Sequence, residues 1–575
     1  MAEAHAIAST ILEGFDRHYR IFRETSKRAK GRFERAAWEE VRQAQRVRID
    51  MYDARVFESV SLIGLSFPHA GTDEALWPEI KRAYVGLLVD HKQPECAETF
   101  FNSVARRVLE SHYYDNEHIF NRPTISTEHL DGEEPTYVCH YPTDRDLKPT
   151  FRAVLEGFGL ANEFQDLDRD VERLNRALEE KFGTTWTVQP NLQVHVLSSL
   201  FFRNKGAYVV GRVLNGPALV PFVVALVLDD QKKVIVDAVL FEPRDLGRLF
   251  GLGLAYFMVD MEVPSAYVEF LATIIPHRPK AELYTCVGLQ KQGKTLFFRD
   301  LQRHLHHSTD KFIIAPGVKG MVMIVFTLPS FGYVFKVIRD WFVPPKDTDR
   351  KQVEERYDFV KHHDRVGRLS DTLEFAHVSF PVARVDPPLL EELERLAPKI
   401  VERDGDRVVL AHLYIEKRLT PLDVFLQGAD EAKLRHGIRE FGAAIKDLAG
   451  ADIFPGDILL KNFGMTRWGR AVFYDYDELV DLSKCRFRTM PKPRDDDDEA
   501  SSDPWFNVEP NDIFPEQFPT FVFQPGRPRE IFMEEHGDLA EARFWREQQE
   551  RRRKGIQEDL FPYAQELRFI HRFEA

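Results

Sequence analysis

Four polar side chains in the last quarter of the chain have a spacing suited to phosphoryl transfer. Asp457 and Asn462 lie five residues apart, and Asp475 and Asp477 follow a short apolar run. In enzymes that transfer a phosphoryl group, one carboxylate orients the attacking hydroxyl, while an amide oxygen and a second carboxylate hold Mg²⁺. The spacing therefore predicts a catalytic role for Asp457 and metal ligation by Asn462 and Asp475. Asp477 is either a second metal ligand or a solvated turn residue.

A glycine-containing turn and a lysine precede these residues in the order that such chemistry requires. Residues 312–341 are expected to form three short strands, with the turn Pro316–Gly320 after the first and Lys336 on the third. Backbone N–H groups of such a turn can surround phosphate oxygens, and an ammonium group neutralises them. This order favours a phosphate-binding site. The alternative is a turn that only connects two strands, followed by an edge-strand lysine that faces solvent. Lys461 either contacts the γ-phosphate or faces solvent.

A strand followed by a linker and a helix is expected downstream of these strands. Val408–Leu413 is typical of a buried strand, Tyr414–Lys417 of a linker, and a helical segment starts near Pro421. Two-lobed kinases join their lobes in this way, so we expect Glu416 and the neighbouring backbone to contact adenine. A kinase also pairs its strand lysine with a carboxylate. The candidates that the sequence does not separate are Glu354, Glu355 and Glu374.

The elements that must position these residues indicate an α+β chain of two domains. With 575 residues the chain is too long for one hydrophobic core. Residues 1–310 are expected to form a mainly α-helical domain, because apolar residues recur at helical spacing and only 192–243 shows the pattern of a β-meander. Residues 311–575 are expected to form a bilobal, protein-kinase-like catalytic domain, with an N-lobe at 311–413 and a C-lobe at 418–575.

Composition limits the partners. The formal net charge of −14 disfavours non-specific binding to nucleic acid or anionic membranes. The four cysteines form no CxxC pair, which fits neither a zinc site nor a disulfide framework and favours a reducing compartment. The most apolar stretch, Pro217–Leu228, is too short to span a bilayer, and no leader sequence is evident. We therefore expect a cytoplasmic protein that binds no membrane.

Six short runs resemble the isocitrate dehydrogenase kinase/phosphatase family of bacteria, and the resemblance extends over essentially the whole chain. The runs are Ala315–Met321, Phe326–Phe331, His363–Arg368, Phe454–Asp457, Lys461–Gly464 and Phe473–Glu478. Ordinary protein kinases do not carry them. This chain has Pro455-Gly456-Asp457 where those kinases have His-Arg-Asp, and Asp475-Tyr476-Asp477 where they have Asp-Phe-Gly. The departures indicate an atypical kinase.

The resemblance implies two opposing activities in one protein. It would phosphorylate a serine of isocitrate dehydrogenase with ATP and Mg²⁺ (or Mn²⁺), and it would also remove that phosphate. The balance would direct carbon between the tricarboxylic acid cycle and the glyoxylate bypass, with the N-terminal half sensing adenine nucleotides such as AMP. The resemblance assigns Asp371 to the phosphatase reaction and Lys336 to the nucleotide. It also assigns ATP contacts to Ala315, Pro316, Gly317, Val318, Lys319, Gly320 and Met321. A homodimer is one oligomeric state that the sequence allows.

Three alternatives stay open at this stage. Small-molecule phosphotransferases of the aminoglycoside or choline type also use an Asp-x4-Asn pattern and a later Asp. A pseudokinase scaffold is disfavoured because Lys336, Asp457 and Asn462 are all present. A dinuclear metal phosphatase, suggested by His362-His363-Asp364 with Asp371, lacks the further Asp and His clusters that such a site needs.

Overall fold

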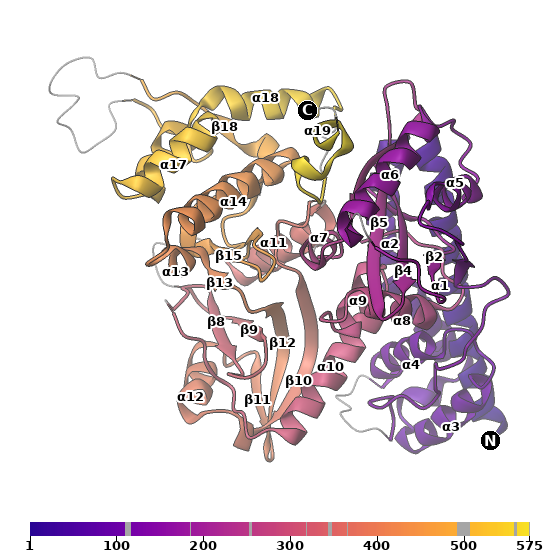
Figure 1. Cartoon of the computed structure of the whole chain (residues 1–575). Helices are drawn as coiled ribbons and strands as arrows, with labels where there is room; N and C mark the ends of the chain where they lie inside the picture. The colour runs from indigo at the N-terminus through magenta and orange to yellow at the C-terminus, as the bar shows by residue number, and fades with distance from the viewer. Residues whose placement is uncertain are drawn as a thin grey trace. The chain divides into compact units, whose positions relative to one another are not determined.

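The chain forms two compact units in the computed structural model (Figure 1). The structure describes residues 1–109, 117–183, 186–251, 256–317, 319–342, 348–364, 366–491, 506–556 and 561–573. Unit 1 contains the described residues up to 309 together with 561–573, and unit 2 contains those from 310 to 556. None of the described helices is long and apolar enough to cross a membrane.

Unit 1 begins with four helices whose apolar faces build its first core. They are α1 (Ala2–Glu34), α2 (Trp38–Ser66), α3 (Trp77–Leu87) and α4 (Pro94–Val108). On α1, the apolar residues from Ile7 to Phe22 recur every three or four positions and are buried, as the helical spacing predicts. They pack against α3 and α4 in one continuous hydrophobic cluster.

The predicted meander is the centre of a six-stranded antiparallel sheet in unit 1, with strand order β1-β2-β4-β5-β6 and β3 paired to β4. The strands are β1 (Tyr137–His140), β2 (Gln193–Leu197), β3 (Phe201–Arg203), β4 (Gly206–Asn215), β5 (Ala218–Leu228) and β6 (Val234–Leu240). The turn from β4 to β5 places Gly216 at φ +62°, the left-handed region that glycine adopts without strain. The expectation of a meander is confirmed.

Helices cover both faces of this sheet. Because side chains alternate along a strand, Ala207 and Val209 belong to the cluster that contains α5 (Lys148–Gly157) and α6 (Leu167–Phe182). Tyr208 and Val210 on the opposite face belong to the cluster of the N-terminal helices. The remaining helices of unit 1 are α7 (Pro243–Leu249), α8 (Pro264–Ile274), α9 (Lys280–Cys286), α10 (Gln290–His307) and α19 (Phe569–Arg572).

The last described residues belong to unit 1, whereas the sequence placed the whole tail in the catalytic domain. Asp237 on β6 is buried, and its carboxylate accepts hydrogen bonds from the Tyr563 hydroxyl (2.6 Å) and from Arg568 Nε (2.9 Å). A buried carboxylate needs such partners, so the tail is held where they are available. A partner pair more than 320 residues apart leaves no local signal in the sequence.

A second six-stranded antiparallel sheet forms the first lobe of unit 2, with order β10-β12-β9-β8-β7 and β11 paired to β12. The strands are β7 (Ile313–Ile314), β8 (Met323–Thr327), β9 (Tyr333–Ile338), β10 (Thr372–Pro381), β11 (Val401–Asp404) and β12 (Arg407–Lys417). Its helices are α11 (Arg350–His363) and α12 (Pro387–Leu396). The three predicted strands with a glycine turn after the first are confirmed.

One boundary in this lobe was predicted wrongly. β12 does not end at Leu413 but continues to Lys417, pairing with β9 on one side and β10 on the other. Tyr414–Lys417 is therefore strand and not linker. The strand propensity of Tyr414 and Ile415, both buried between neighbouring strands, outweighs the charged residues that suggested a linker.

The second lobe of unit 2 is mainly helical. Its helices are α13 (Leu422–Leu426), α14 (Glu431–Gly450), α16 (Phe518–Val522), α17 (Arg527–His536) and α18 (Ala542–Arg553). Short strand pairs complete it: β13 (Thr420–Pro421), β14 (Ile453–Phe454), β15 (Phe463–Met465), β16 (Ala471–Phe473), β17 (Val480–Asp481), β18 (Arg486–Phe487) and β19 (Asp512–Ile513). A sheet lobe followed by a helical lobe confirms the α+β, kinase-like fold class.

Candidate active site

The catalytic loop, defined as residues 454–462, runs from β14 to β15 and carries Asp457. Gly456 has φ +76°, and a Cβ atom on it would lie 2.1 Å from the backbone oxygen of Glu478. Only glycine fits this approach, because any side chain would be strained and would collide with main chain. The glycine before Asp457 is thus a steric requirement, and its close contact fixes the backbone position of the half-buried Asp457.

Asn462 closes the catalytic loop and is only 3% exposed. Its Nδ2 donates a hydrogen bond to the backbone oxygen of Asp457 at 3.1 Å, which orients the amide. Its Oδ1 accepts no hydrogen bond from any described residue. An oriented amide oxygen with an open lone pair is a suitable ligand for a hard cation such as Mg²⁺.

The hairpin of β15 and β16 brings Asp475 to Asn462. Phe463 pairs with Phe473, and the N–H of Tyr474 donates to the backbone oxygen of Asn462 at 3.1 Å. The Tyr474 hydroxyl also donates to the backbone oxygen of Lys461. Asp475 therefore follows immediately after a residue that is bonded to the catalytic loop. The hairpin therefore places the segments that carry Asn462 and Asp475 side by side.

Lys336 joins this cluster from the sheet lobe. It is 7% exposed, and its Nζ lies 2.9 Å from Glu416 Oε1 and 3.0 Å from the backbone oxygen of Tyr474. These contacts hold the ammonium group next to the segment that carries Asp475. An ammonium group has three donors, and contacts within the described residues use two of them. The third is available to an anionic ligand.

Glu416, predicted as an adenine contact, is instead the carboxylate that pairs with Lys336. Lys336 lies opposite Tyr414 and Val334 lies opposite Glu416, so Lys336 and Glu416 are diagonal neighbours on one sheet face. Burial raises the pKa of the Glu416 carboxyl, and the Lys336 ammonium opposes part of that rise. The correction follows from the continued strand, which gives this side chain a partner across β9.

The three sequence candidates for that carboxylate lie elsewhere. Glu374 on β10 is bonded to His412 at 2.9 Å, and Glu355 on α11 lies 3.7 Å from Lys351. Glu354 also lies on α11 and forms no ion pair with a described residue. If the predicted strand had extended to Glu416, the alternation of side chains would have indicated this pairing. Glu416 lies two positions beyond Tyr414, which is opposite Lys336.

The glycine turn occupies the connection between β7 and β8. Gly317 has φ +121°, which only glycine adopts readily, and the N–H of Ala315 donates to the Val325 oxygen at 3.0 Å. The Lys319 ammonium is paired with Glu392 on α12. The Gly320 oxygen accepts a hydrogen bond from Arg339. Of the remaining predicted contacts, Pro316 and Met321 are exposed, and Val318 lies outside the described residues.

Comparison with known proteins accounts for this combination of residues. The family model described as "Isocitrate dehydrogenase kinase/phosphatase (AceK), regulatory domain" matches residues 8–309, and the model for the kinase domain of the same family matches residues 310–565. The chain belongs to the isocitrate dehydrogenase kinase/phosphatase family.

Curated members of the family are similar along nearly their full length. "Isocitrate dehydrogenase kinase/phosphatase" of Paraburkholderia xenovorans (strain LB400) is 50% identical over 99% of this chain and 93% of its own length. The proteins of the same name from Burkholderia mallei (strain SAVP1) and Burkholderia pseudomallei (strain K96243) are 49% identical over 99% of this chain and 94% of their own lengths. The resemblance inferred from six short runs is confirmed.

Asp371, which the family resemblance assigns to dephosphorylation, is a buried residue just before β10. Its neighbour Ser370 donates an N–H to the Phe473 oxygen at 2.9 Å and accepts a hydrogen bond from the Tyr476 hydroxyl at 2.6 Å. Both contacts lie on the segment that carries Asp475. Sequence reasoning could only call Asp371 a carboxylate near the lysine lobe, whereas the structure joins its segment to the residues that follow β16 and include Asp475.

Proposed function

We propose that this chain phosphorylates a serine of isocitrate dehydrogenase with ATP and also removes that phosphate. The observation that carries the proposal is the bonding of Lys336 to the Tyr474 oxygen beside the hairpin that joins Asn462 and Asp475. These bonds connect a buried ammonium group with the segment of Asp475 and with the oriented amide of Asn462. Phosphoryl transfer depends on such electrostatic positioning.

In the kinase direction, each side chain has one task. Lys336 neutralises phosphate charge with its remaining donor, and Glu416 holds the lysine in place. Asp457 orients the serine hydroxyl and accepts its proton as the serine oxygen bonds to the γ-phosphorus and the bond to ADP breaks. Asn462 and Asp475 would hold Mg²⁺ or Mn²⁺, which would offset the negative charge of the phosphates. Asp477 is proposed as a further ligand.

In the phosphatase direction, we propose that the same pocket accepts phosphoserine. Asp371 orients a water molecule and accepts its proton as the water oxygen bonds to phosphorus and the bond to the serine oxygen breaks. The proton then passes to the serine oxygen, and inorganic phosphate leaves. The proposal predicts that Lys336→Ala lowers both activities, because both would use one phosphate site. Retention of wild-type phosphatase activity in a kinase-dead Lys336→Ala protein would separate the two sites.

The decisive assay mixes the purified chain, Mg-ATP and isocitrate dehydrogenase. Labelled phosphate is expected on the dehydrogenase, together with loss of dehydrogenase activity that returns when ATP is replaced by ADP. Asp457→Asn is expected to abolish labelling, and Asp371→Asn to block recovery while labelling persists. Asp404→Asn, at an exposed position at the end of β11, serves as the matched control and is expected to behave as wild type.

Two other functions predict different outcomes in this assay. A small-molecule phosphotransferase would consume ATP with aminoglycosides or choline and leave the dehydrogenase unlabelled. A pseudokinase scaffold would show no Mg-ATP-dependent thermal stabilisation. Family membership over the whole chain favours the protein substrate.

The regulatory proposal concerns unit 1. We infer that unit 1 senses adenine nucleotides such as AMP, and that the enzyme acts in the cytoplasm on flux between the tricarboxylic acid cycle and the glyoxylate bypass. Addition of AMP is expected to change the ratio of the two activities. The two rates measured with and without AMP at constant ATP test this, and an unchanged ratio would refute it.

A further inference from the structure

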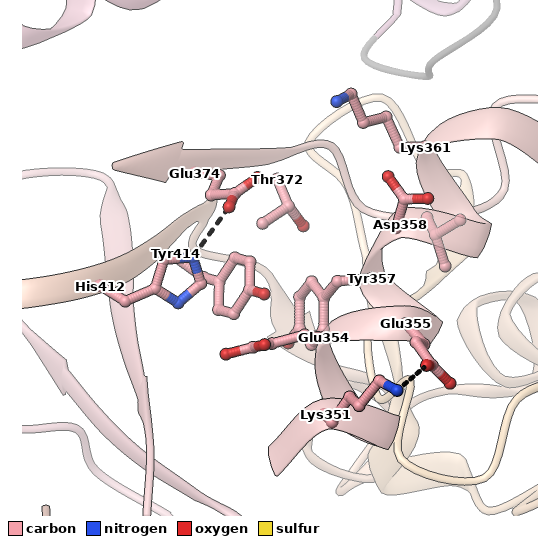
Figure 2. A pocket seen from close by; sticks show the side chains of 11 residues that line it. Lys351, Glu354, Glu355, Tyr357, Asp358, Lys361, Thr372, Glu374, His412 and Tyr414 are labelled. Atoms are coloured by element: carbon pink, nitrogen blue, oxygen red, sulfur yellow. Dashed lines mark hydrogen bonds and ion pairs between the residues drawn. The ribbon is translucent and has the colours of Figure 1, made fainter. Parts of the chain in front are cut away.

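A cavity of about 660 Å³ lies in unit 2 between α11 and the strands β10 and β12 (Figure 2). The helix contributes Glu354, Tyr357 and Asp358 to its wall, and the strands contribute Glu374 and Tyr414. None of these residues has a role in the phosphoryl-transfer cluster described above. The volume is within the range of cavities that hold small ligands or a side chain of a partner.

The charge of this cavity excludes phosphate-bearing ligands and favours cations. Four carboxylates line it, and two lysines and a histidine accompany them, which leaves a formal excess of two negative charges with the histidine neutral. Glu355 is offset by Lys351 and Glu374 is bonded to His412. Glu354 has no ion-pair partner among the described residues. A dianionic phosphate would meet like charges here, whereas a cation would be attracted.

Two tyrosine hydroxyl groups in the wall point to a ligand with hydrogen-bond donors. Tyr414 is 3% exposed and Tyr357 is 8% exposed, and their rings stack at 4.1 Å between centroids. Neither hydroxyl forms a hydrogen bond with any described residue. A tyrosine whose ring is buried and whose hydroxyl group stays accessible can offer that hydroxyl group to a ligand. Because the two rings stack on each other, the tyrosines present their hydroxyl groups, at the ring edges, to the cavity.

The carboxylates lie around one of these rings. In the view of Figure 2, the Tyr414 ring lies between the side chains of Glu374 and Glu354. Burial raises the pKa of the Tyr414 phenol, and the charges of Glu374, Glu354 and Asp358 raise it further. The phenol therefore stays protonated, with an oxygen lone pair that can accept a hydrogen bond in the midst of carboxylates.

We propose that this cavity binds a guanidinium group, supplied either by an arginine-like small molecule or by an arginine side chain of a peptide segment. A guanidinium group is a planar cation with five donors and no acceptor. It complements a wall made of carboxylate and phenol oxygens and can bond a carboxylate through two parallel N–H groups. An ammonium group is a compact point charge with three donors, so it satisfies fewer of these oxygens.

The test measures the binding of matched probes to the full chain by calorimetry at low ionic strength. The first probe is N-acetyl-arginine methylamide, and the second is a short glycine peptide with one central arginine. Each is compared with its citrulline counterpart, which keeps the shape but is neutral. At least fivefold weaker binding of both citrulline probes is expected. Similar affinities for the two arginine probes identify a small guanidinium ligand, and tighter peptide binding identifies a protein segment.

Variants assign the binding to this cavity. Glu354→Gln and Glu374→Gln each remove one charge with little change in shape and are expected to weaken arginine binding at least fivefold. Glu391→Gln, at an exposed position on α12, is the matched control and is expected to bind as wild type. Tyr414→Phe removes only the hydroxyl group and provides a second test of arginine binding if a glutamine variant folds poorly. Equal binding of arginine and citrulline probes, or arginine binding that all three cavity variants leave unchanged, would overturn the proposal.

Discussion

Both units contain a six-stranded antiparallel sheet with a buried charged side chain, but the two charges are used differently. In unit 1, the Asp237 carboxylate on β6 is enclosed by Tyr563 and Arg568. In unit 2, the Lys336 ammonium on β9 has Glu416 and the Tyr474 oxygen. The first set of contacts engages both carboxylate oxygens, and the second leaves one donor open among the described contacts.

This difference separates a structural charge from a candidate catalytic one. A buried charge whose hydrogen bonds are complete has a structural role, because removal of one partner leaves an uncompensated charge in the core. A buried charge with one open donor can bind an anion without first breaking a contact, which is the condition for preorganised electrostatic catalysis. Removal of the contacts of Asp237 is therefore expected to lower the free energy of unfolding. Removal of the Lys336 ammonium group is expected to lower the turnover rate.

The largest expected effect is that of Lys336→Met on the kinase rate. Loss of one preorganised donor to the phosphate is expected to lower kcat by roughly 10²–10³-fold. The measurement is initial-rate phosphorylation of isocitrate dehydrogenase with saturating Mg-ATP. Lys311→Met, at an exposed position before β7, is the control. A kcat within threefold of wild type would show that Lys336 is structural like Asp237.

Arg568→Ala is expected to have the largest effect on stability, with little effect on the chemistry of unit 2. It leaves the buried Asp237 carboxylate with the Tyr563 hydroxyl alone, which is expected to cost about 3 kcal/mol of unfolding free energy. Denaturant unfolding followed by circular dichroism measures this loss. Arg572→Ala breaks the more exposed pair with Glu180 and is expected to cost at most about 1 kcal/mol. Equal losses for the two variants would contradict the comparison.

A third buried group is Glu95 on α4, which forms no ion pair with a Lys or Arg among the residues that the structure describes. Its Oε1 accepts a hydrogen bond from the Tyr284 hydroxyl at 2.9 Å, and burial raises its pKa to about 7. The folded state then binds this proton more tightly than the unfolded state, so stability falls as pH rises from 5 to 7. Glu95 is expected to lower the wild-type free energy of unfolding by roughly 2 kcal/mol over this pH range. Glu95→Gln is expected to lack this loss.

Thermal unfolding of wild type and Glu95→Gln at pH 5, 6 and 7 measures the effect. Glu269→Gln, at an exposed position on α8, is the control that keeps the wild-type pH dependence. Parallel pH profiles for wild type and Glu95→Gln would mean that Glu95 is ionised in the folded protein at all three values.

The smallest expected effects come from two matched helix caps, one in each unit. The Asp166 carboxylate accepts from the Arg169 N–H at 3.0 Å at the start of α6, and Asp430 accepts from the Lys433 N–H at 2.8 Å at the start of α14. Replacing either aspartate by alanine is expected to cost about 1 kcal/mol. Scanning calorimetry is expected to show Asp166→Ala and Asp430→Ala moving different unfolding transitions. If both variants move the same transition, the two units unfold as one.

Much of the site could be predicted because the information is local. Asp457, Asn462 and Asp475 lie within nineteen residues, and short spacings in a loop and hairpin restrict where these side chains can go. The glycine turn and Lys336 were predicted for the same reason, since the alternation of strand and turn residues is visible within one segment. The end of β12 was predicted wrongly, because charged residues within a strand resemble a loop in the sequence when the neighbouring strands are unknown.

The sequence by itself determined the elements, the order of the phosphate-handling residues and the family, because these depend on periodicity and on short motifs. Only the tertiary structure decided the partners of the buried charges. Glu416 reaches Lys336 across two strands, and Asp237 is paired with a residue 331 positions away. Such pairs are selected by the cost of leaving a buried charge without a partner, and that cost acts only once the chain has folded.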